Sequence, residues 1–193
     1  MSLVLASASP RRREILLGLG VSFDVVVPDV VETKQGEPAA MVLENARRKA
    51  AAGAELVGGQ PTVMGVDTDV FLDGVALGKP SGREDAGVRL QALSGRSHDV
   101  LSGLVLLGPR DGDGRADERS AVARTRVTFR ELSTETVRIY LDSGEWRDRA
   151  GAYAIQGLGS ILAATIEGDV SNVVGLPVTS LLELAPELIA SRE

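Results

Sequence analysis

The order of apolar and polar positions predicts strands and helices that alternate along the whole chain. Short apolar runs between turn residues predict strands, and apolar residues spaced three and four apart predict helices. We expect strands at Leu3–Ala6, 23–27, Thr62–Leu72, 75–77, 100–107, 122–129 and 161–166. We expect helices at 10–19, 38–52, 81–94 and 132–143, and a last helix from Pro177 that is interrupted at Pro186. This alternation indicates an α/β fold with a mixed sheet.

Turn and cap residues set several boundaries within this pattern. Asp73-Gly74 is a hairpin turn signal. Ser81 and Glu84 have the spacing of a capping box at the start of the third helix. The segment 108–120, GPRDGDGRADERS, has the composition of an exposed loop, so we expect it on the surface.

Composition limits the kind of protein and the kind of chemistry. The 193 residues, 44% of them hydrophobic, suit a single domain over 1–193, or one domain with two lobes. A net charge of −6 and 3% aromatic residues argue against a nucleic acid polymer as partner. The absence of cysteine and the single histidine, His98, exclude a disulfide framework and a Cys/His zinc site. The chemistry must therefore use carboxylates, lysine, arginine and hydroxyl groups.

The lengths of the apolar runs predict the location of the protein in the cell. No run approaches the ~20 apolar residues that cross a bilayer. The chain starts with a strand-like LVLA where a signal peptide would show a basic region and a longer apolar one. We therefore expect a cytoplasmic protein without a membrane partner.

Three consecutive arginines, residues 11–13, begin the first predicted helix, where the helix dipole disfavours each cation by roughly 0.3–1 kcal/mol. Arg12 lies on the apolar stripe of this helix, so it either snorkels over the sheet edge or lines a cleft. Ser7 and Ser9 occupy the preceding turn, where Ser9 suits the N-cap and Pro10 the first helical position. Hydroxyl groups, free helix N–H groups and a guanidinium together predict a phosphate site made by these two serines and Arg12.

Two aspartates interrupt an otherwise apolar strand in the segment GVDTDVFLDG. Asp67 and Asp69 are expected on one face of this strand, roughly 6.5–7 Å apart, with Thr68 on the other face. Aspartate is depleted in strands, so the pair suggests a site. Asp69 alone is equally compatible with a solvated strand end.

Three more charged residues are candidates for the same site. Lys49 shares a helix face with Val42 and Ala46, where a core residue would be expected, although a lysine near a helix end is usually solvated. The hairpin after the aspartates returns Lys79 towards them. Glu32 follows the second strand, and its position relative to the cleft stays open at this level.

Several motifs in matching order resemble the Maf family of nucleoside triphosphate pyrophosphatases. They are SASPRR, GVDT with DG…GKP, LSGRSHDV, DRAGAYAIQG and IEGDVSNVVGLP. The resemblance implies an elongated mixed β-sheet flanked by helices, with two lobes and a central cleft (Maf/ITPase-like), and a homodimer is expected from the family alone. It implies hydrolysis of a nucleoside triphosphate to the monophosphate and pyrophosphate with Mg²⁺ or Mn²⁺, which cleans nucleotide pools.

The resemblance also implies roles for individual residues. Asp67 would be the catalytic base, Glu32 would join it at the metal, and Arg12, Lys49 and Lys79 would complete the catalytic and phosphate site. Three positions differ from what relatives commonly carry, namely Arg48, Asp69 and Ala154. None of them removes a residue with an implied role, and only Asp69 bears on metal binding.

Substrate choice is implied by Arg11, Thr68 and Gln156. Within the family that the chain resembles, Arg, Thr and Gln at these places mark the group acting on dTTP and UTP. The Gln156 amide offers a donor and an acceptor, which suits the edge of uracil or thymine. By itself, Gln156 would be better explained as an amide that caps the backbone of a glycine-rich loop.

Two other functions remain compatible with these residues. One is a nucleotide-binding regulator of cell division without turnover, for which Asp67 beside Lys79 would weaken anion binding. The other is a pyrophosphatase acting on 7-methyl-GTP.

Overall fold

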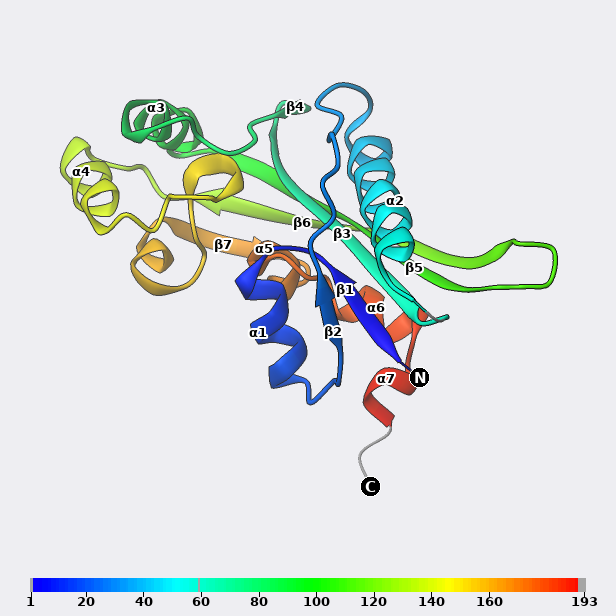
Figure 1. Cartoon of the computed structure of the whole chain (residues 1–193). Helices are drawn as coiled ribbons and strands as arrows, with labels where there is room; N and C mark the ends of the chain where they lie inside the picture. The colour runs from blue at the N-terminus through cyan, green and yellow to red at the C-terminus, as the bar shows by residue number, and fades with distance from the viewer. Residues whose placement is uncertain (1, 59, 191–193) are drawn as a thin grey trace.

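One mixed sheet of seven strands organises the chain, which a computed structural model describes at residues 2–58 and 60–190 (Figure 1). The single-domain prediction includes residues 1, 59 and 191–193, which lie outside this description. The strands are β1 (Leu3–Ala6), β2 (Asp24–Val26), β3 (Thr62–Leu72), β4 (Val75–Ala76), β5 (Ser97–Arg110), β6 (Ala116–Phe129) and β7 (Ala163–Glu167). Their order is β2-β1-β3-β5-β6-β7, and β4 pairs with β3. The first three strands of this order are parallel and the others antiparallel, as a mixed sheet requires.

Helices cover both faces of the β1–β3–β5 part of the sheet. Alternate residues of β1 point to opposite faces, so Leu5 packs in the cluster that holds Leu16 of α1 (Pro10–Gly18). Val4 packs with Val63 on the face of α2 (Pro38–Leu56). On the face of the sheet that α1 covers also lie α5 (Val170–Val174), α6 (Val178–Leu184) and α7 (Glu187–Ala190) (Figure 1).

Two glycines let α2 lie directly on the sheet. A Cβ atom at Gly65 of β3 would collide with the backbone at Ala46, and one at Gly103 of β5 would collide with the backbone at Val42. Only glycine allows this close approach. As a result, one face of α2 stands directly over the central residues of β3.

A second lobe surrounds the other end of the long strands. Its helices are α3 (Arg83–Leu93) and α4 (Thr134–Ser143), with the short 3₁₀ helices η1 (Ala150–Ala152) and η2 (Gly157–Ile161). They enclose a separate apolar cluster that includes Leu90, Phe129 and Tyr140. The predicted elongated mixed sheet with two lobes is confirmed.

Two local predictions were wrong. Segment 108–120 is largely strand, because β5 and β6 continue to Arg110 and from Ala116; backbone pairing in a hairpin does not require apolar side chains. The capping box does not form. Gly82 is the N-cap of α3, and Ser81 donates from its backbone N and its Oγ to the carboxylate of Asp85.

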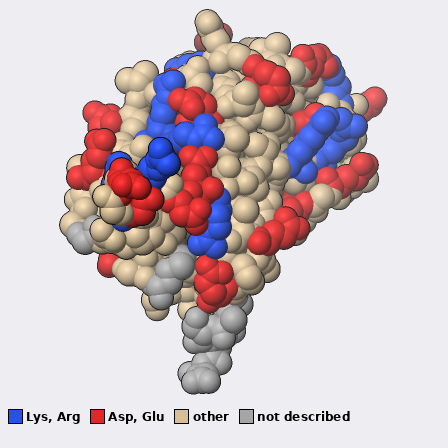
Figure 2. Space-filling view, turned by 90° about the vertical axis from the view of Figure 1, so that its right-hand side faces the viewer, with Lys and Arg blue, Asp and Glu red and all other residues tan. Residues whose placement is uncertain are grey.

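Acidic and basic side chains alternate over the face that lies at the right of Figure 1, as Figure 2 shows. This face therefore carries no extended basic patch. Within the described residues, no helix has the length and apolarity needed to cross a membrane.

Candidate active site

A cavity of about 1000 Å³ opens between the two lobes. Its walls come from the turn between β1 and α1, the segment after β2, the middle of α2, the centre of β3 and the turn after β4. The segment 147–150 and the end of α5 close the remaining side. All predicted site residues except Gln156 are among the described residues that line this cavity: Ser7, Ser9, Arg11, Arg12, Glu32, Lys49, Asp67, Thr68 and Lys79.

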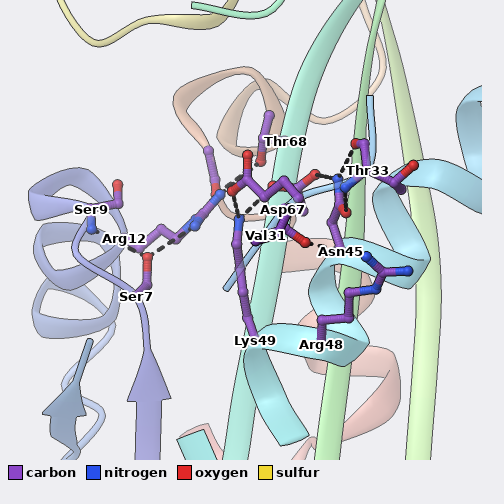
Figure 3. A network of polar contacts seen from close by, with 12 residues as sticks. Ser7, Ser9, Arg12, Val31, Thr33, Asn45, Arg48, Lys49, Asp67 and Thr68 are labelled. Carbon is purple, nitrogen blue, oxygen red and sulfur yellow. Dashed lines mark hydrogen bonds and ion pairs between the residues drawn. The ribbon is translucent and has the colours of Figure 1, made fainter. Parts of the chain in front are cut away.

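Arg12 is the most constrained cation of the cavity and is only 8% exposed. Its Nη1 donates to Ser7 Oγ at 2.9 Å, and its Nη2 donates to Thr68 Oγ1 at 3.2 Å (Figure 3). Its Nε donates to the carbonyl oxygen of Gly175 at 2.8 Å. Arg12 therefore lines the cleft and does not snorkel to the surface.

All three of these acceptors are neutral, and no described carboxylate forms an ion pair with Arg12. Burial lowers the pKa of Arg12 to about 10, because the charged form loses its hydration. A buried cation is usually compensated by a nearby anion. The geometry thus supports an anionic ligand beside Arg12.

Asp67 lies at the centre of β3 and is 7% exposed. Its Oδ1 is 2.6 Å from Nζ of Lys49, and the same Nζ is 2.5 Å from Oε1 of Glu32. The two carboxylates that were expected to hold a metal therefore converge on one ammonium group. The helix-face argument that placed Lys49 towards the sheet agrees with this geometry.

Asn45 completes the surroundings of Asp67, and sequence reasoning missed it. Its Nδ2 donates to Asp67 Oδ2 at 3.0 Å and to the carbonyl oxygen of Thr33 at 3.0 Å, while its Oδ1 accepts from the Thr33 backbone N at 2.8 Å. Asn45 precedes Lys49 by four residues, so both lie on the same face of α2. This spacing, combined with a buried amide, is the signal that could have found it.

Asp69 points to backbone donors. Its Oδ1 accepts from the backbone N of Val70 at 2.7 Å and of Gly78 at 3.0 Å. Burial raises the pKa of Asp69 to about 6. The bond to Gly78 fixes the turn that presents Lys79, so Asp69 shapes the cavity wall and is not simply a solvated strand end.

The three residues implied in substrate choice are not equivalent. Arg11 lines the cavity and donates from Nη2 to the carbonyl oxygen of Asp148 at 3.2 Å. Thr68 Oγ1 lies 2.7 Å from Ser102 Oγ and accepts from Arg12, so its hydroxyl belongs to the arginine network. Gln156 is exposed, makes no capping bond to η2 and is not among the described lining residues.

The serines of the first turn also differ in position. Ser7 Oγ accepts from Arg12 and from the backbone N of Ser9 at 3.2 Å. Ser9 is the N-cap of α1 with Pro10 after it, but its side chain makes no capping bond. Ser9 and Pro10 line the same cavity as Arg12.

Comparison with known proteins decides the family. The family model described as Maf-like protein matches residues 2–188. The chain belongs to the Maf family. A dTTP/UTP pyrophosphatase of Myxococcus xanthus is 49% identical over 188 residues, covering 95% of this chain and 92% of that protein. A dTTP/UTP pyrophosphatase of Vibrio vulnificus is 43% identical over 189 residues, covering 97% and 98%.

This Maf protein also matches a third relative and one solved structure. A dTTP/UTP pyrophosphatase of Caldanaerobacter subterraneus subsp. tengcongensis is 42% identical over 185 residues, covering 95% of this chain and 87% of that protein. The structure of the Staphylococcus aureus Ham1 protein matches 66% of this chain and 72% of its own at 17% identity. The TM-score of this match is 0.40.

In this Maf protein, the SASPRR, GVDT, GKP and DRAGAY segments all reach one cavity. The last segment, IEGDVSNVVGLP, supplies the carbonyl of Gly175 to Arg12. Asn172 anchors it by donating from Nδ2 to the carbonyl oxygen of Val100 at 3.0 Å and to Thr125 Oγ1 at 3.1 Å. The motifs are therefore close in space although they span most of the chain.

The Asn45 contacts lead to a prediction for this Maf protein. Asn45→Ala should lower kcat roughly ten- to hundredfold, because a hydrogen bond to a charged group contributes about 1.5–3 kcal/mol and orients Asp67. The matched control is Arg48→Ala, which removes the bond from Arg48 Nη1 to the carbonyl oxygen of Val31 and leaves Asp67 untouched. Steady-state kinetics on UTP measures both. Equal losses would show that Asn45 acts only by holding the segment after β2.

Proposed function

We propose that this protein hydrolyses nucleoside triphosphates, above all dTTP and UTP, to the monophosphate and pyrophosphate. The observation that carries the proposal is the buried Asp67, with donors on both carboxylate oxygens, in a cavity that also holds the buried Arg12. The names of relatives at 42–49% identity support the same reaction. The protein would thereby clear unwanted nucleotides from the pool.

In this mechanism Asp67 accepts a proton from a water molecule that attacks the α-phosphorus. A P–O bond forms to the water oxygen, and the bond from the α-phosphorus to the bridging oxygen breaks. Pyrophosphate takes the electron pair of that bond. Lys49 and Asn45 each donate to one carboxylate oxygen, which fixes the orientation of the Asp67 carboxylate.

Cations around Asp67 bind the triphosphate. Arg12 and Lys79, with the first N–H groups of α1, would neutralise phosphate charge as it moves to the leaving group. Ser7 keeps the Arg12 guanidinium in place, and Ser9 offers a hydroxyl at the same helix end. Lys49 lies within 2.6 Å of both Asp67 and Glu32, so it also offsets part of their negative charge.

The donor set fits a divalent cation that enters with the substrate. The carboxylates of Glu32 and Asp67 converge on Nζ of Lys49, so a divalent cation would bind their remaining lone pairs beside this ammonium group. No cluster of three acidic, histidine or cysteine residues suited to a metal occurs among the described residues. Mg²⁺ is commonly held by one or two carboxylates together with substrate phosphates and water. Mg²⁺ or Mn²⁺ held by Glu32 and Asp67 would supply further neutralisation of phosphate charge.

Substrate choice is assigned to Arg11, Thr68 and Gln156. Thr68 would act through Arg12, and Arg11 would act directly from the cavity wall. Gln156 is the N-cap residue of η2. The Glu145 carboxylate holds this helix by accepting from the backbone N of Leu158 at 2.9 Å and of Gly159 at 3.0 Å. The Gln156 amide would meet the base at the cavity margin.

A kinetic panel tests this function and its substrate. With Mg²⁺, we expect kcat/KM for dTTP and UTP to exceed the values for 7-methyl-GTP, ATP and dCTP. Gln156→Ala should reduce this preference more than it reduces the rate on poor substrates, because a site built for one base edge rejects others through unpaired polar groups. A best rate on 7-methyl-GTP would reassign the substrate. Binding without turnover on any nucleotide would instead favour a regulator.

A further inference from the structure

Cations without acidic partners are concentrated in the cavity. Elsewhere, most arginines are paired, for example Arg47 with Glu118 at 2.8 Å and Arg138 with Glu135 at 2.6 Å. Figure 2 shows the same alternation of charges across one face. Among the described residues that line the cavity, by contrast, only Lys49 and Arg89 have ion pairs, and six cations have none: Arg11, Arg12, Lys34, Lys79, Arg147 and Arg149.

Arg149 is the half-buried member of this set that no motif argument has assigned. Its Nε donates to the carbonyl oxygen of Glu145 at 3.2 Å, which leaves both Nη groups without a bond to any described residue. A guanidinium that is anchored through Nε keeps its two Nη groups in a fixed fork. This fork matches the oxygens of a phosphate group.

Hydrogen bonds on either side of Arg149 tie its segment to Arg11 and to the turn that carries Lys79. The carbonyl of Asp148 accepts from Arg11, and the backbone N of Gly151 donates to the carbonyl oxygen of Gly78 at 2.9 Å, directly before Lys79. Residues from three separate parts of the chain are thus held in one wall. After burial, the charge of Arg149 is the largest influence that lowers the pKa of Arg11, so the two guanidinium groups repel each other.

We propose that Arg149 and Lys79 form the subsite that binds the pyrophosphate end of the substrate and holds pyrophosphate before release. This inference rests on the proposed function. Lys49 and Asn45 contact Asp67, where the α-phosphorus would react, so the unpaired cations of the 147–150 segment and Lys79 would meet the remaining phosphates. Two adjacent phosphate groups would offset the electrostatic repulsion between Arg11 and Arg149.

Product binding tests the subsite independently of turnover. Inorganic pyrophosphate and UMP are titrated by calorimetry into the parent protein and into Arg149→Ala and Arg149→Lys, with Mg²⁺ present. Arg149→Ala should weaken pyrophosphate binding roughly ten- to hundredfold, as expected for hydrogen bonds to a charged group, and change UMP binding less than about twofold. Arg149→Lys, which keeps the charge and loses the fork, should be intermediate.

Arg138→Ala is the matched control, because it removes the same charge from the same lobe at an exposed ion pair. It should leave both affinities unchanged. Unchanged pyrophosphate binding in a folded Arg149→Ala protein would overturn the subsite, as would a larger loss for UMP than for pyrophosphate. If the parent protein failed to hydrolyse any nucleotide, the proposed function would fail, whereas a parent that turns over UTP with unaltered Arg149→Ala kinetics would refute only the subsite.

Discussion

Asp67→Asn should lower kcat for UTP by at least ~10²-fold, the usual contribution of a general base. The amide has almost the shape of the carboxylate but cannot accept the proton from water. Its NH₂ group would also face either Nζ of Lys49 or Nδ2 of Asn45, both of which donate to Asp67 in the parent protein. Initial-rate kinetics and thermal unfolding of the two proteins measure activity and folding separately.

The control for this result is Asp69→Asn, the same substitution two residues further along β3. Asp69 also lines the cavity, but its Oδ1 accepts from the backbone, which an asparagine oxygen can replace. We therefore expect Asp69→Asn to keep most of the activity. Activity of Asp67→Asn within a few-fold of the parent would remove Asp67 as the base.

Arg12→Ala should lower kcat/KM by roughly 10²–10³, the range for loss of one preorganised electrostatic donor. Arg12 is buried, and its hydrogen bonds join the first turn, β3 and the end of α5. Its removal also takes one hydrogen-bond donor from each of Ser7 Oγ, Thr68 Oγ1 and the carbonyl oxygen of Gly175. Kinetics must therefore be measured well below the unfolding midpoint of the variant.

Arg13→Ala is the matched control, because Arg13 follows on the same helix and is not among the described lining residues. Its loss should change kcat/KM only slightly. Arg12→Lys, which keeps the charge and loses the three-way hydrogen bonding, should recover part of the rate. Equal losses at positions 12 and 13 would show that charge on α1, and not its geometry at the cavity, determines activity.

The spacing of apolar residues predicted those strands and helices whose buried residues recur regularly along the chain. The strand Thr62–Leu72 was predicted with the bounds that the structure shows. The alternation of side chains along it correctly placed Asp67 and Thr68 on opposite faces of the sheet. The polar hairpin after β5 was missed because its strands are held by backbone pairing and have little core to bury. The order of apolar and polar residues within a segment does not reveal backbone pairing of this kind.

The site could be predicted only in part for a related reason. Helix projection placed Arg12 and Lys49 towards the sheet, since it depends on neighbours a few residues away. Gly175 and Arg149 enter the cavity through contacts between distant segments, which a single sequence does not reveal. Asn45 had one local signal, its position four residues before Lys49 on α2, but its bond to Asp67 joins two separate elements. The exposed position of Gln156 likewise depends on how η2 packs beside Glu145.

The position of bond cleavage tests the central claim most directly. UTP is hydrolysed in H₂¹⁸O with Mg²⁺, and the products are separated and analysed by mass spectrometry. Attack of water on the α-phosphorus beside Asp67 predicts one ¹⁸O atom in UMP and unlabelled pyrophosphate. Label in pyrophosphate, or orthophosphate as the first product, would contradict the account.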